Sequence, residues 1–126
     1  MITDIDHASI LDRRDIESFL DYYDGLVADA ANDDYTDIER IEFQYPLDEY
    51  DKVHVLQLRA MVSDSRDDSF INEGYMAEYA REYADEVFGL DGTGASEYFD
   101  YEKYADNFIV DYTSWEYDGV TYYSRD

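Results

Sequence analysis

Apolar residues recur every three or four positions in two long segments, and this spacing is typical of amphipathic helices. In the first segment they are Ile16, Phe19, Leu20, Tyr23, Val27 and Ala30. In the second, from about Tyr75 to Phe88, they are Met76, Tyr79, Ala80, Tyr83, Ala84 and Val87. Asp12, with Asp15 three residues later, is placed to cap the first helix, which Asn32-Asp33-Asp34 ends. Gly89 is placed to close the second in a left-handed conformation.

Other patterns are shorter. Residues 38–45 partly alternate and are rich in β-forming side chains, which predicts a strand that Pro46 ends. Residues 1–11 have room for one strand, and residues 63–69 are expected to form a polar loop. Residues 48–63 fit either a strand or a helix. Asp48, Glu49 and Asp51 favour the helix, because negative charge is favourable in a first turn.

The last third of the chain predicts two more elements. Residues 98–108 indicate a shorter helix after a flexible connector at residues 91–94. Residues 110–117 and 120–123 flank Asp118-Gly119, the signature of a type I′ hairpin turn. We therefore predict an α+β fold, in which a small antiparallel sheet or hairpins pack with three to four short helices and the chain ends in a hairpin. Residues 1–66 and 67–126 are expected to form two regions of one compact or slightly elongated unit.

The net charge is the property that bears most on whether the chain folds. The 126 residues include 33 Asp or Glu and nine Lys or Arg, for a formal charge of −24, beside 15 tyrosines. Such acidity with low hydropathy is typical of disorder. However, Leu, Ile, Val and Phe make up about 22% of the chain, just above the disordered range. The tyrosine rings add buried surface, so we expect a folded protein.

Composition also indicates where in the cell the protein is expected to act. There is no cysteine, no apolar run long enough to span a bilayer and no secretory signal pattern. The charge would repel anionic lipid and nucleic acid. We expect a soluble protein of a bacterial or archaeal cytoplasm that binds neither membrane nor nucleic acid directly.

The residues give little support to catalysis. His7 and His54 have no neighbouring ligand at metal-binding spacing, and residues 32–37 lack the glycine of a calcium loop. No phosphate-binding loop or nucleophile elbow is present. With 33 acids, a chance pair of carboxylates carries no information. We expect no enzyme activity, no cofactor and no metal.

The carboxylates themselves form a pattern. Glu17, Asp21 and Asp24 repeat at helical spacing, as do Glu78, Glu82 and Asp85 with Glu86 beside them, and Asp100, Glu102 and Asp106 add to these on the next helix. Residues four apart rise about 6 Å along a helix. Several such rows approach the charge density of duplex DNA, with one phosphate per roughly 3.4 Å of each strand. A DNA-binding protein with a basic groove is therefore the expected partner.

The segment Tyr75-Met-Ala-Glu-Tyr-Ala-Arg-Glu-Tyr-Ala-Asp-Glu-Val-Phe-Gly-Leu90, followed by Glu97-Tyr-Phe-Asp-Tyr-Glu-Lys-Tyr-Ala105, resembles the C-terminal part of the ArdA antirestriction family. The resemblance covers about residues 70–126. It implies a DNA mimic, carried by a phage or mobile element against host defence, that blocks the DNA-binding groove of type I restriction–modification enzymes. It adds Glu97 to the mimicking carboxylates. It also implies a homodimer with Tyr79, Tyr83, Val87 and Phe88 at the interface, although the same side chains would equally suit an intramolecular core.

Three alternatives stay open from the sequence. The chain could mimic DNA toward another nuclease system, as an anti-CRISPR protein. It could be an acidic protein of a salt-loving organism with an ordinary binding role, since it has only two lysines and more Asp than Glu. It could also bind cations loosely over its acidic surface.

Overall fold

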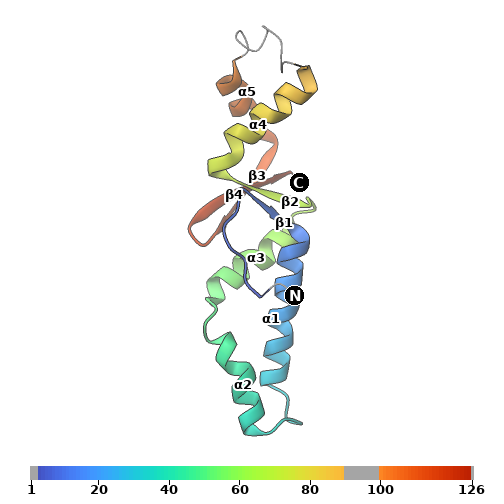
Figure 1. The fold of residues 1–126 in the computed structure, drawn as a ribbon, viewed down its shortest axis with the longest axis vertical. Coiled ribbons are helices and arrows are strands. Elements are labelled where there is room, and N and C mark those ends of the chain that lie inside the picture. Colours follow the sequence, from blue (N-terminus) through green and yellow to red (C-terminus); the bar gives the residue numbers. More distant parts are fainter. Residues whose placement is uncertain (1–2, 90–99, 126) are drawn as a thin grey trace.

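The elements follow one another along the length of the molecule, with a small sheet in the middle and helices at both ends (Figure 1). This computed structural model describes residues 3–89 and 100–125. The described elements are β1 (Ile10–Asp12), α1 (Arg13–Ala30), α2 (Asp37–Leu47), α3 (Lys52–Asp64), β2 (Ser69–Asn72), α4 (Glu73–Phe88), α5 (Tyr101–Phe108), the 3₁₀ turn η2 (Ile109–Asp111), β3 (Tyr112–Tyr117) and β4 (Val120–Arg125).

The sheet confirms the predicted α+β class and the C-terminal hairpin. Its four strands lie in the order β1-β2-β4-β3, and every neighbouring pair is antiparallel. Asp118 and Gly119 both have positive φ, 50° and 74°, as a type I′ turn requires. Strand β2 falls where the sequence predicted the end of a polar loop. That prediction was wrong at Ser69, which pairs with Asp12.

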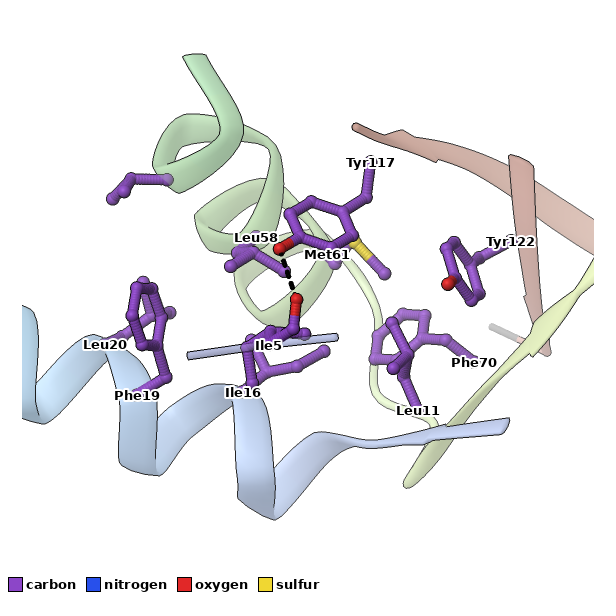
Figure 2. Close-up of a cluster of buried hydrophobic side chains, with 11 residues drawn as sticks. Ile5, Leu11, Ile16, Phe19, Leu20, Leu58, Met61, Phe70, Tyr117 and Tyr122 are labelled. Atoms are coloured by element: carbon purple, nitrogen blue, oxygen red, sulfur yellow. Dashed lines mark hydrogen bonds between the residues drawn. The ribbon is translucent and has the colours of Figure 1, made fainter. Parts of the chain in front are cut away.

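The main core lies where α1 and α3 meet the sheet (Figure 2). Its fully buried members come from four elements: Ile16, Leu58, Met61, Phe70 and Tyr122. The N-terminal segment is tied to it by Ile5, which is buried and whose carbonyl accepts a hydrogen bond from the Tyr117 hydroxyl at 2.7 Å.

Helix ends largely follow the predicted signals. The Asp12 side chain caps α1 by accepting from the backbone N–H of Arg14 at 2.8 Å. Asp51 caps α3, which confirms the helical reading of this region, with Asp48 and Glu49 before the helix rather than in its first turn. Helix α4 begins two residues earlier than predicted because Asn72 caps it. The connector at 91–94 and the predicted start of the next helix at 98 lie outside the described residues.

Residues 38–45 are helical, so the predicted strand was wrong. Thr36 caps α2 by accepting from the backbone N–H of Glu39 at 3.2 Å. Leu47 is buried and the Phe43 ring contacts Tyr35 at 5.2 Å between centroids, so these two residues form an inward face at helical spacing. Pro46 stands in the last turn, where it removes one backbone hydrogen bond without dividing the helix.

Two glycines should respond oppositely to alanine. Gly89 closes α4 with φ of 62°, so Gly89→Ala is expected to cost roughly 1 kcal/mol. Gly25 lies inside α1 with open space where a Cβ would stand, so Gly25→Ala should stabilise by about 0.5–1 kcal/mol. Urea unfolding of both variants measures the difference. Equal shifts in one direction would contradict the assigned backbone conformations.

Candidate protein-binding face of helices α4 and α5

Helix α4 presents a row of carboxylates away from the sheet. Its buried side is made of Met76, Ala80 and Ala84. Glu78, Glu82 and Glu86 are exposed and stand four residues apart, so their Cα atoms rise about 6 Å from one to the next along the helix. The small alanines allow α4 to lie close to its neighbours while its acidic row stays in solvent.

Helix α5 is fixed against α4 by aromatic rings. The Phe108 ring lies 6.0 Å from Tyr79, 5.3 Å from Tyr83 and 5.8 Å from Tyr104, measured between ring centroids. It also contacts Tyr112 of β3 at 5.2 Å. Burial raises the pKa of Tyr112 to about 12. This aromatic cluster holds the carboxylates of α5 in a fixed place beside those of α4.

A polar contact joins the two helices on another side. The Tyr101 hydroxyl donates to the Asp85 carboxylate at 2.5 Å, and the Arg81 guanidinium lies 4.6 Å above the Tyr101 ring. Tyr101 and Arg81, together with Ala77 and Ala105, border a shallow groove of about 310 Å³ between the helices. Glu78, Glu102 and Asp106 line the same groove, so acids from both helices meet at one place.

We call five of the exposed carboxylates of the two helices the acidic face: Glu78, Glu82, Glu86, Glu102 and Asp106. Asp85 and Asp100, also predicted as mimicking residues, stabilise the fold. Asp85 is half-buried and bound to Tyr101, and Asp100 caps α5 by accepting from the backbone N–H of Lys103 at 3.0 Å. Glu97 lies outside the described residues.

Positive charge is distributed unevenly over the molecule. Among the described residues, the carboxylates that pair with arginine are Asp12, Glu17, Asp24, Asp33 and Asp37, all in or beside α1 and α2. The described carboxylates of α4 and α5 form no ion pair with Lys or Arg. The acids of these two helices outnumber Arg81 and Lys103, so this end of the molecule carries net negative charge, which costs stability through self-repulsion and favours a cationic partner.

The acidic row of α1 is different. Glu17 pairs with Arg13 at 2.8 Å, and both oxygens of Asp24 accept from the Arg59 guanidinium, which leaves Asp21 exposed. Helix α1 also lies on the opposite side of the sheet from α4 along the length of the molecule (Figure 1). The structure thus does not bring the two predicted rows together.

One carboxylate of the acidic face is also held by a tyrosine. The Tyr75 hydroxyl donates to both oxygens of Glu82, at 3.2 and 3.0 Å. This hydrogen bond raises the pKa of Tyr75, because it favours the neutral phenol beside the carboxylate. The row on α4 is thereby partly preorganised.

Three of the four residues predicted for a self-contact have intramolecular ring partners. Tyr79 and Tyr83 contact Phe108, and Phe88 contacts Tyr104 edge-on at 5.9 Å, so these rings have intramolecular partners. Tyr83, Val87 and Phe88 are nevertheless 40%, 54% and 55% exposed. A self-contact through them stays a prediction.

The two histidines, read from the sequence as isolated, meet at one carboxylate. His7 Nε2 lies 3.1 Å from one oxygen of Asp118 and His54 Nε2 lies 3.2 Å from the other. His7 Nδ1 shares a hydrogen bond of 2.9 Å with the Tyr122 hydroxyl. The sequence signals the turn at Asp118 but not what contacts it. Within residues 3–89 and 100–125, no group of His, Asp and Glu is arranged to hold a metal ion.

Comparison with known protein families, with curated proteins and with solved structures finds no match. Over the described part of the chain, no helix has the length and apolar content needed to cross a membrane.

Proposed function

We propose that this protein is a DNA mimic of the antirestriction type, which occupies the DNA-binding groove of a type I restriction–modification enzyme and performs no chemistry. The binding surface is the acidic face, with Asp85 and Asp100 beside it. Glu97 belongs to the proposed set from the sequence alone. Asp21 and the arginine-paired Glu17 and Asp24 on α1 are secondary to it. Binding displaces counter-ions from the lysines and arginines of the target. The protein would act in the cytoplasm of the host.

The observation that carries the proposal is the absence of Lys and Arg partners for the described carboxylates of α4 and α5, which gather on two packed helices, while five acids in or beside α1 and α2 are paired with arginine. A stable fold alone gives no reason to gather unpaired charge on two packed helices, where like charges four residues apart are destabilising. The resemblance of residues 70–126 to ArdA proteins supports the choice of target class. The comparisons do not detect that family, so the geometry of the charges is the main support.

The test is competition for a purified type I enzyme. Labelled duplex DNA is bound to the enzyme, the protein is added, and DNA release is followed by fluorescence anisotropy. We expect release at low salt, with an inhibition constant that weakens at least about tenfold between roughly 50 and 200 mM NaCl. If DNA is not released from this enzyme at low salt but is released from a DNA-guided or RNA-guided nuclease, the target belongs to another defence system.

Folding in salt separates the proposal from the halophilic alternative. A mimic should show its full circular dichroism spectrum at physiological salt, because it must act there. A halophilic protein should need molar salt, which screens its self-repulsion. Titration calorimetry with Ca²⁺ addresses the third alternative, and a stoichiometric heat of binding would favour it.

A further inference from the structure

Helix α2 carries an apolar stripe that is largely exposed to solvent. Ile38, Ile41 and Tyr45 are 74%, 65% and 71% exposed. They stand three and four residues apart, so they form one continuous surface on the helix. We call these three residues the outer stripe. It covers about 10 Å of helix, or two turns.

The outer stripe is not the face by which α2 packs. Leu47 is buried, Phe43 contacts Tyr35, and Arg40 turns back to Asp33 and Asp37. These contacts satisfy the inward side of the helix. The outer stripe is therefore a second apolar face, placed at the far end of the molecule from α5 (Figure 1).

Acidic residues border the outer stripe. Glu42 neighbours both Ile38 and Tyr45 at helical spacing, and Asp48 lies three residues after Tyr45. Both are exposed, and neither forms an ion pair with Lys or Arg among the described residues. An apolar strip with negative borders is complementary to an apolar strip with positive borders.

We propose that the outer stripe is a docking surface for a cationic amphipathic helix of a partner protein, which lays its apolar face on Ile38, Ile41 and Tyr45 and its basic flanks against Glu42 and Asp48. A second copy of this chain fits poorly, because it would place Glu42 and Asp48 against one another within an assembly of twice the net charge of −24. The acidic border equally opposes an anionic lipid surface. This inference does not require the acidic face of α4 and α5 to imitate DNA.

The probe for the test is a fluorescent synthetic helix with leucines on one face and lysines on both flanks. Its matched control carries glutamates in place of the lysines. We expect the lysine peptide to bind the whole protein and the glutamate peptide not to bind. The triple variant Ile38→Ser, Ile41→Ser, Tyr45→Ser should bind the lysine peptide at least tenfold more weakly. The double variant Val53→Ser, Leu56→Ser removes another exposed apolar pair, on α3, and should stay within about twofold of wild type.

A second variant keeps the stripe and changes its border. Glu42→Lys with Asp48→Lys should lose the lysine peptide and gain the glutamate peptide, without any apolar change. Equal binding by wild type and the triple variant would overturn the proposal, as would equal losses in the triple and the Val53/Leu56 variants. Sedimentation that shows a dimeric wild type and a monomeric triple variant would also overturn it, because a second copy would then cover the stripe. The amide variant of the acidic face, described below, should retain a stripe-dependent difference in peptide binding even if it loses DNA competition.

Discussion

Converting the acidic face to amides is expected to abolish competition with DNA while leaving the fold intact. The variant is Glu78→Gln, Glu82→Gln, Glu86→Gln, Glu102→Gln, Asp106→Asn. Exposed ion pairs contribute modestly, roughly twofold to fivefold in affinity each, so five should weaken inhibition by at least about thirtyfold if they add. Asp85 and Asp100 are left unchanged because they hold Tyr101 and the start of α5. The inhibition constant from the anisotropy assay is the measurement.

The matched control removes five exposed carboxylates from other surfaces: Asp15→Asn, Asp64→Asn, Asp68→Asn, Asp111→Asn, Glu116→Gln. Both variants have the same net charge, so a general electrostatic attraction would weaken equally in both. We expect the control to stay within a few-fold of wild type. Single amide changes on the acidic face should each lose less than about fivefold. One single change that removed all activity would contradict a contact distributed over many charges.

The largest effect on stability is expected at Phe70. This ring is fully buried in β2, at the meeting of the sheet with the helical core (Figure 2). Phe70→Ala should cost about 3–5 kcal/mol, because it removes buried apolar surface and leaves a cavity. Domains of this size are stabilised by roughly 5–15 kcal/mol in total. The variant should therefore unfold at a clearly lower urea concentration than wild type, and added salt should raise its stability by screening the self-repulsion.

Urea is the suitable denaturant for this measurement, because guanidinium would itself screen the charges. Val87→Ala is the matched control, since it removes apolar atoms from a residue that is 54% exposed, and it should change stability by no more than about 0.5 kcal/mol. If Phe70→Ala and Val87→Ala unfold at the same urea concentration, Phe70 does not belong to the core.

Local signals predicted much of the fold. Asp12 and Gly89 mark ends of helices through cap geometry that depends on neighbouring residues alone, and Asp118-Gly119 fixes its turn in the same way. The short strands β1 and β2 carry no such signal. Three residues of β1 pair with residues 69–71, and this register is decided by tertiary packing. The sequence predicted a strand for α2 because Ile41 and Tyr45 of the outer stripe alternate with Phe43 of the inward face, which imitates the two-residue period of a strand.

The candidate site was predicted in part. The rows on α4 and α5 are readable because four-residue spacing places side chains on one side of any helix. Their meeting in one groove depends on how Phe108 packs α5 onto α4, which no local pattern specifies. The pairing of Asp24 could not be predicted, because Arg59 is distant from it in sequence and reaches it only when α3 packs beside α1. The pairing of Glu17 with Arg13, by contrast, follows from their four-residue spacing on α1.

The strand order has a consequence for synthesis on the ribosome. Strand β4 lies between β2 and β3, yet it is made after both. A nascent chain that has reached Tyr117 can form α1 to α4, but β2 has one open edge, β3 has no partner, and Tyr122 is missing from the core. Folding must therefore wait for residues 120–125. Its slow step should be the pairing of β4 with β2, which are distant in sequence, rather than helix formation. Until then, the open edge of β2 and the uncovered Phe70 are exposed, and strong negative charge along the nascent chain keeps such intermediates apart.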